Sequence, residues 1–223
     1  MTIGDTTLPE LIGVVIISYL IGSIPTGYLL ARAMKGIDIR DHGSGSTGAT
    51  NVLRVLGRGP FVAVMIADSL KGYIPAMGAW LIFDSYDAQV AAGIAAVIGH
   101  DFPIYIGFQG GRGVATTFGV FAAMALPVFV GLVAVGIFIL IGLRYMSVAS
   151  IITVPLGTLV FLILWLLGVD EFIFTKVVFG LFATALVLIT HLPNIRRLMM
   201  GTEPRIGDSL EVPPEPHSAR TTT

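Results

Sequence analysis

The chain has 223 residues, of which 55% are apolar and only 12% carry a formal charge. Soluble domains average about 25% charged residues, so this composition excludes an ordinary soluble domain and predicts an integral membrane protein. The net charge of −1 gives no basic bias for nucleic acid, and the absence of cysteine excludes disulfides, thiolate catalysis and cysteine-ligated metals.

The first apolar run covers residues 8–33 and is long enough to cross the roughly 30 Å hydrocarbon core of a bilayer. Small and hydroxyl residues interrupt its second half, which we interpret as close helix packing. A second span is expected over residues 61–83. It contains Asp68 and Lys71, which share one helix face and are expected to form a structural ion pair at membrane depth.

Further apolar segments cover residues 88–99, 114–143, 151–168 and 172–189. As a single helix, residues 114–143 would be about 45 Å long, which exceeds one comfortable span, and Pro127 offers a place to divide them. The membrane domain is expected to comprise residues 1–203. Residues 204–223 are rich in Pro, Glu, Ser and Thr and are expected to form a disordered tail.

The positive residues predict the topology, because basic loops remain cytoplasmic. Loop lysines and arginines gather in four regions, around residues 32–58, 112, 144 and 196–205, whereas the other connections are mainly acidic. These regions share one side of the membrane only if residues 114–143 form two spans. The sequence therefore predicts an all-α integral membrane protein, a compact bundle of seven transmembrane helices with the N-terminus outside and the C-terminus cytoplasmic.

Three polar segments fall on the expected cytoplasmic face and carry groups that suit phosphate. Residues 43–54 combine three glycines with hydroxyls and end in Arg54; residues 108–116 again combine glycines with an arginine, Arg112. Glycine-rich turns fold backbone N–H groups into a nest that accepts an anion, and a guanidinium fork matches phosphate. The third segment, residues 190–197, contains His191, which could donate to phosphate or act as a general base.

Two interpretations of this face remain open at this point. One is a metal-independent enzyme acting on a phosphorylated substrate, since no Walker loop, His-Glu-x-x-His motif or Asp-Gly dipeptide is present. The alternative is a membrane transporter of a phosphorylated anion, because broken helices with glycines and positive charge are typical of transporters. The one-sided placement of the polar segments favours the enzyme.

Three motifs, in order along the chain, resemble the bacterial glycerol-3-phosphate acyltransferases that take acyl phosphate as donor, the PlsY family. They are residues 43–54 (GSGSTGATNVLR), residues 99–116 (from GHDFP to GGRGVAT) and residues 191–203 (HLPNI through GTE). The similarity extends over residues 17–203. The resemblance implies acyl transfer from acyl phosphate to the 1-hydroxyl of sn-glycerol 3-phosphate, giving lysophosphatidate and phosphate at the cytoplasmic face of a bacterial inner membrane.

The resemblance also implies the site residues and partners. The expected catalytic residues are His191, Ser44, Arg54 and Arg112, and the expected substrate-binding residues are Gly43, Ser46, Thr47, Gly48, Thr50, Asn51, Gly110, Gly111, Gly113, Ser147, Ser150, Asn194 and Glu203. The expected partners are glycerol 3-phosphate, acyl phosphate and the lipid bilayer, without a metal, a cofactor or nucleic acid; the sequence does not predict the oligomeric state. Two positions depart from the family pattern, since Gln109 replaces a usual lysine and Ser46 a usual asparagine.

Overall fold

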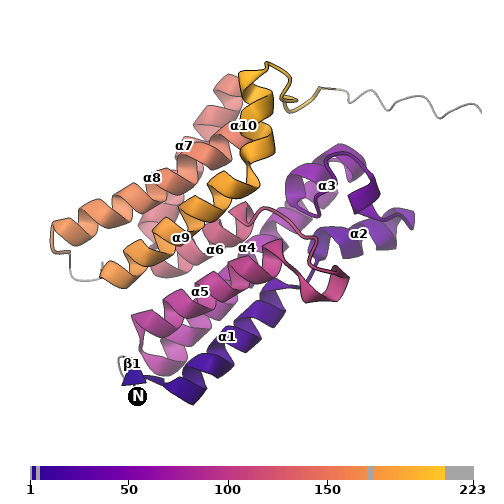
Figure 1. The fold of residues 1–223 in the computed structure, drawn as a ribbon. Coiled ribbons are helices and arrows are strands. Elements are labelled where there is room, and N and C mark those ends of the chain that lie inside the picture. The colour runs from indigo at the N-terminus through magenta and orange to yellow at the C-terminus, as the bar shows by residue number, and fades with distance from the viewer. Residues whose placement is uncertain (1, 4–5, 170–172, 209–223) are drawn as a thin grey trace, which may run out of the picture.

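The computed structural model describes residues 2–3, 6–169 and 173–208, and helices dominate it (Figure 1). A two-residue antiparallel pair precedes the first helix. The elements, in chain order, are β1 (Thr2–Ile3), β2 (Thr6–Thr7), α1 (Leu8–Gly22), α2 (Thr26–Lys35), η1 (Ile39–Asp41), α3 (Ala49–Leu56), α4 (Arg58–Phe83), α5 (Tyr86–Asp101), η2 (Ile104–Ile106), α6 (Val114–Met124), α7 (Leu126–Leu143), α8 (Met146–Leu166), α9 (Phe174–Thr190) and α10 (Leu192–Met199).

Several of these segments are long and apolar enough to cross a membrane. Among the described residues, four qualify by length and composition, namely Leu8–Lys35, Tyr86–Ile106, Leu126–Leu143 and Met146–Leu166. The bent pair of α9 and α10, with 56° between them, would be a fifth. Helix α4 has 26 residues but carries Asp68 and Lys71 in its interior, and α6 has only 11 residues.

The expected division of residues 114–143 is confirmed. Helix α6 ends at Met124, α7 begins at Leu126, and Pro127 lies in the first turn of α7, where the missing N–H has no helical partner to lose. Two segments differ from the expectation. The first apolar run is divided into α1 and α2 at residues 23–25, and α8 already begins at Met146. The chain reverses at Arg144, whose φ of 63° ends α7, so Ser147 and Ser150 lie on the first turns of a helix rather than in a loop.

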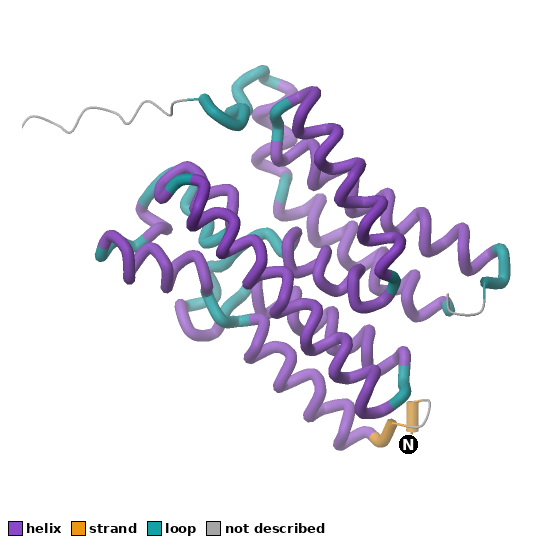
Figure 2. Tube along the Cα trace, turned by 180° about the vertical axis from the view of Figure 1, so that it is seen from behind, coloured by secondary structure: helices purple, strands orange, loops and turns teal. Residues whose placement is uncertain are grey.

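The helices form two packed groups joined through α4 and α6. Helix α1 packs on α5 and α5 on α4, while α7, α8 and α9 pack in sequence; α6 contacts members of both groups. Figure 1 shows the N-terminus and the end of α8 at one end of the bundle, with α2, α3 and α10 at the other, and Figure 2 shows the same arrangement from behind. The basic segments therefore lie at the end opposite to the N-terminus.

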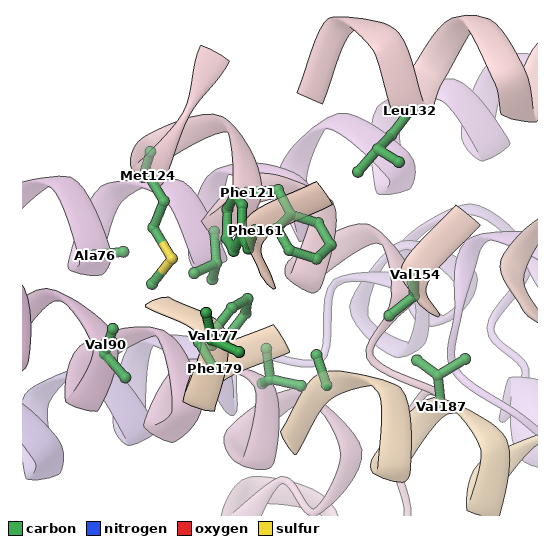
Figure 3. Packing of buried hydrophobic residues seen from close by; sticks show 14 residues of the cluster. Ala76, Val90, Phe121, Met124, Leu132, Val154, Phe161, Val177, Phe179 and Val187 are labelled. Carbon is green, nitrogen blue, oxygen red and sulfur yellow. The ribbon is translucent and has the colours of Figure 1, made fainter. Parts of the chain in front are cut away.

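The core of the bundle is centred on three buried phenylalanines from different helices. The ring of Phe121 on α6 meets Phe161 on α8 edge-on at 5.3 Å between centroids, and Phe179 on α9 at 5.6 Å (Figure 3). All three side chains are fully buried. Edge-to-face aromatic pairs add about 0.5–1.5 kcal/mol each to the burial of apolar area. This cluster fixes α6 relative to α8 and α9. Because α6 directly follows the second glycine-rich segment, the cluster also fixes the end of that segment.

The first part of the expected tail is attached to the bundle. The amide of Ile206 donates to the carbonyl of Arg144 at 2.7 Å, and the guanidinium of Arg144 donates back to the carbonyl of Ile206. Arg205 donates to the hydroxyl of Tyr145. Residues 209–223, where the disordered tail is expected to continue, lie outside the described residues.

Candidate active site

A cavity of about 630 Å³ lies where the three polar segments meet. Its polar lining contains twelve of the expected site residues, namely Ser44, Ser46, Gly48, Thr50, Asn51, Arg54, Arg112, Ser147, Ser150, His191, Asn194 and Glu203. Its apolar lining comes mainly from α4, α6 and α7, and includes Phe61, Met65, Ile66, Phe118, Phe129, Val133, Ile137 and Leu140. One cavity thus combines a polar and an apolar region.

The first glycine-rich segment is folded around the side chain of Asn51. Its amide nitrogen donates to the carbonyls of His42 at 2.9 Å and Ser46 at 2.8 Å, and its oxygen accepts the N–H of Ser44 at 2.8 Å. Gly43 has a φ of 62°, and a Cβ at this position would collide with the Asn51 oxygen. Asn51 is 1% exposed. Its side chain therefore shapes this segment from within, while Ser44 and Ser46 lie on the cavity wall.

The second glycine-rich segment folds back on the end of α5. The N–H of Gly110 donates to the carbonyl of Asp101 at 3.2 Å, and the N–H of Gly111 donates to the carbonyl of His100 at 3.1 Å. The carbonyl of Gly110 accepts the N–H of Thr47 at 3.3 Å, which joins the two glycine-rich segments directly. The backbone donors of Gly110 and Gly111 are thus used within the protein.

Two helices begin at these segments and turn their first residues toward the cavity. Helix α3 begins with Ala49 and Thr50, and α6 begins with Val114 and Ala115. All four residues line the cavity. The first N–H groups of a helix have no partner within it, and the helix dipole gives this end a partial positive charge. Two helix N-termini around one cavity form a favourable environment for anions.

Arg54 and Arg112 add full positive charges to the same wall. Burial lowers the pKa of Arg112, and the nearby guanidiniums of Arg197 and Arg54 lower it further. Burial also lowers the pKa of Arg54, with Glu203 opposing and Arg197 adding to this shift. Within the part of the chain that the structure describes, neither Arg54 nor Arg112 forms an ion pair or side-chain hydrogen bond. Both remain available to a bound anion.

Glu203 is the carboxylate of this site, and its oxygens are already engaged. One oxygen accepts from the hydroxyl of Ser147 at 2.7 Å and from the amide of Asn194 at 2.6 Å; the other accepts from Arg197 at 2.8 Å. Burial raises the pKa of Glu203, but these hydrogen bonds outweigh burial and leave it below its ordinary value. The ionised carboxylate therefore orients Ser147 and Asn194 at the cavity wall.

His191 lies between α9 and α10 and is 3% exposed. Its Nδ1 lies 2.9 Å from the carbonyl oxygen of Val187, which can only accept, so Nδ1 carries a proton. The other ring nitrogen, Nε2, then has a free lone pair in the neutral ring. Burial and the charge of Arg112 lower the pKa of His191 to about 4, so the ring is neutral near pH 7 and holds an accepted proton only weakly.

Several expected site residues lie outside the cavity wall. Gly43, Thr47, Gly110, Gly111 and Gly113 are absent from the lining and form the backbone behind it. Gln109 is exposed and also lies outside the lining. Among the described residues, no group of three or more His, Asp or Glu side chains is arranged to hold a metal ion.

The structure also adds residues that the sequence did not indicate for the site. His100 and Asp68 line the cavity, as do Arg205 and Ile206 from the segment after Glu203. The spacing of Val133, Gly136, Ile137 and Leu140 marks one face of α7, but almost every residue of α7 is apolar, so the sequence could not distinguish this face from the others.

The chain is similar to known proteins over most of its length. The family model described as glycerol-3-phosphate acyltransferase matches residues 12–201. Two proteins named glycerol-3-phosphate acyltransferase, from Halalkalibacterium halodurans and Gloeobacter violaceus, are each 42% identical; the alignments cover 88% and 90% of this chain and 96% and 97% of theirs.

Two crystal structures of PlsY (YgiH), described as an integral membrane glycerol 3-phosphate acyltransferase, are 39% identical to this chain. The glycerol 3-phosphate form has a TM-score of 0.81 and the lysophosphatidic acid form 0.78, over 88% of this chain and 96% and 95% of those chains. This likeness and the apolar helices show an all-helical integral membrane protein. From its sequence, its fold and the match over residues 12–201, the chain belongs to the glycerol-3-phosphate acyltransferase family.

Proposed function

We propose that the protein transfers a fatty acyl group from acyl phosphate to the 1-hydroxyl of sn-glycerol 3-phosphate. The observation that carries the proposal is the two-part cavity of about 630 Å³, in a chain of the glycerol-3-phosphate acyltransferase family. Each substrate carries a phosphate, which suits the arginines and helix N-termini. The donor also carries an acyl chain, which suits the apolar wall of α4, α6 and α7.

In the proposed reaction, the 1-hydroxyl oxygen attacks the carbonyl carbon of the acyl phosphate. An ester C–O bond forms, the bond between the carbonyl carbon and the phosphate oxygen breaks, and inorganic phosphate leaves with the electron pair. His191 accepts the hydroxyl proton at Nε2, because Nδ1 is held by the Val187 carbonyl, and passes it to an oxygen of the departing phosphate. Ser44, Arg54 and Arg112 hold phosphate oxygens, and hydrogen bonds to such charged groups contribute about 1.5–3 kcal/mol each.

Ser147, Ser150 and Asn194 supply neutral polar groups to the cavity wall. Glu203 orients two of them, and its ion pair with Arg197 offsets its negative charge at the cavity wall. The remaining site residues, including Asn51 and Thr47, support the reaction by shaping the backbone. In this proposal, one set of residues contacts the substrates, and a second set holds the first set in position.

The proposed topology has seven spans, formed by α1, α4, α5, α6, α7, α8 and α9, with the N-terminus outside and the cavity facing the cytoplasm of a bacterial cell. Two observations support it. Figure 1 has the N-terminus and α10 at opposite ends of the bundle, and α3, the helix that carries Arg54, lies at the α10 end. Some apolar lining residues, such as Ile66 and Ile137, are half exposed at 52% and 51%, so an acyl chain could enter from the bilayer.

The test uses protein purified in detergent, a long-chain acyl phosphate and glycerol 3-phosphate. We expect lysophosphatidate and inorganic phosphate in equal amounts, and no product when glycerol replaces glycerol 3-phosphate. Acyl-CoA is the comparison donor. Equal turnover with acyl-CoA would contradict the assignment of the donor, and the absence of lysophosphatidate with either donor would refute the proposed function.

A further inference from the structure

A buried group, formed by the ion pair of Asp68 and Lys71 and the imidazole of His100, borders the cavity and takes no part in the reaction as described. Nζ of Lys71 lies 2.9 Å from Oδ1 of Asp68, and Nδ1 of His100 lies 3.8 Å from the same oxygen. The hydroxyl of Thr26 donates to that oxygen as well. Asp68, Lys71 and His100 are 1%, 6% and 5% exposed. Charges at membrane depth are costly, and a buried ion pair adds little stability over an apolar pair, so stability alone does not explain this group.

The group is connected to the first glycine-rich segment through α2. Lys71 donates to the carbonyl of Ile24 at 2.9 Å, and Thr26 holds Asp68, so both ends of the break between α1 and α2 are fixed. Gly27 then packs on the carbonyl of Thr47 so closely that a Cβ would collide with it. This close packing couples the position of Thr47 to the start of α2.

The group is connected to the second glycine-rich segment through His100. The imidazole lies directly against Gly111, where a Cβ would collide with Nε2, and the carbonyl of His100 accepts the N–H of Gly111 at 3.1 Å. The bond from Thr47 to Gly110 then closes a ring of contacts that runs through both segments. The His100 imidazole therefore supports the backbone next to Arg112, and the Asp68–Lys71 pair supports, through α2, the backbone that leads to Arg54.

We propose that Asp68, Lys71 and His100 are positioning residues that hold the two glycine-rich segments in register, and so set the relative placement of Arg54 and Arg112. They act through Thr47 and Gly111. The proposal rests on the proposed function only in taking phosphates as the ligands of these segments.

The first test measures the segments directly and needs no substrate. Single removal of Asp68 or Lys71 would leave an unpaired buried charge and could unfold the chain, so the variant is Asp68→Asn with Lys71→Met, which removes both charges together. Hydrogen exchange should become at least about fivefold faster in residues 43–48 and 108–113, with α8 and α9 unchanged. The control, Ile74→Ala on the exposed face of α4, should leave both segments unchanged. Unchanged exchange in the double variant would overturn the proposal.

The second test asks whether His100 sets the position of Gly111. Gly111→Ala should lower kcat/KM at least about tenfold in the wild-type background, and by much less when His100→Ala has removed the ring. The control is Gly59→Ala, because a Cβ there meets nothing within 4 Å. An equal loss from Gly111→Ala in both backgrounds would show that the contact does not position the segment.

Enzyme kinetics separate positioning from a merely structural role. Loss of folded protein lowers activity in proportion and leaves KM unchanged, whereas misplaced segments should raise KM for glycerol 3-phosphate or acyl phosphate in protein that keeps its Tm. An inactive wild-type protein would refute the proposed function, while hydrogen exchange would still decide the positioning role.

Discussion

The amide of Thr47 donates to the carbonyl of Gly110 at 3.3 Å, and this bond joins two glycine-rich segments that are distant in the sequence. Arg54 lies on the helix that follows the first segment, and Arg112 lies two residues after Gly110. The separation of the two guanidiniums therefore depends on backbone contacts between the segments. A site for two phosphates needs such fixed cations, because a preorganised charge requires no rearrangement during the reaction.

Replacement of Arg112 should damage the reaction more than any change at the neighbouring Gln109. Arg112 lines the cavity and has no ion-pair partner among the described residues, so Arg112→Ala should lower kcat/KM about a hundredfold or more. Arg112→Lys should keep part of the activity, because it retains the charge and loses the two-pronged geometry. Steady-state assays at equal amounts of folded protein give the comparison.

Gln109→Ala is the matched control, since Gln109 is exposed and lies outside the cavity wall. The kcat/KM of Gln109→Ala should remain within a few-fold of the wild-type value. A larger loss from Gln109→Ala than from Arg112→Ala would show that the uncharged residue, and not the arginine, is the important member of this segment.

Glu203 should make stability depend on pH in a defined direction. Its pKa is lowered in the folded protein, so the ionised carboxylate stabilises the fold at pH above the ordinary value of about 4.3, and this contribution is lost as the pH falls through the folded pKa. Glu203→Gln should therefore lower Tm most near neutral pH. The difference in Tm between Glu203→Gln and the wild type should become smaller below about pH 4. A difference that is constant with pH would contradict an ionised carboxylate.

The sequence was a good guide to the helices and to the three polar segments that meet at the cavity. The split at Pro127 followed from segment length, and the polar segments were identifiable because each interrupts an apolar chain. It was a poor guide to which side chains are already engaged in contacts within the protein. Asn51 and Glu203 bond inward, and His100 packs behind Gly111, because long-range backbone contacts decide these orientations. Such long-range contacts cannot be predicted from the local amino-acid composition.

The proposed topology predicts which positions are accessible from outside the cell. The chain has no cysteine, so single cysteines can be introduced without interference. Cysteines at Gln109 and Thr202, both exposed at the α10 end, should be protected from an impermeant thiol reagent in intact cells. A cysteine at Val169, just beyond α8, should react. Labelling of the first two in intact cells would contradict cytoplasmic placement.

The length of the acyl chain should be limited by Phe118 and Phe129 at the inner end of the apolar wall. Their rings meet edge-on at 6.2 Å, and Phe118 also lies 6.5 Å from Phe121, which is part of the buried core. A chain that reaches these rings cannot go further without displacing that core. Along α7, the distance from Leu140 to Phe129 is about 16 Å, roughly half of the hydrocarbon thickness of a bilayer.

Two substitutions on α7 should therefore change chain-length preference in opposite directions. Phe129→Ala opens the inner end, and should raise kcat/KM for longer acyl phosphates relative to shorter ones. Gly136→Leu should do the reverse, because Gly136 lines the cavity and a Cβ there fits at 3.5 Å from Thr153, so the added side chain occupies the groove. Each excluded methylene is worth about 0.8 kcal/mol, so a change of two or three carbons should alter the ratio of kcat/KM values about tenfold or more. Phe138→Ala is the control, since Phe138 is 79% exposed on the outer face of the same helix. Identical chain-length preferences in all three variants would mean that the acyl chain leaves the groove sideways into the lipid. Its length would then not be limited by the rings of Phe118 and Phe129.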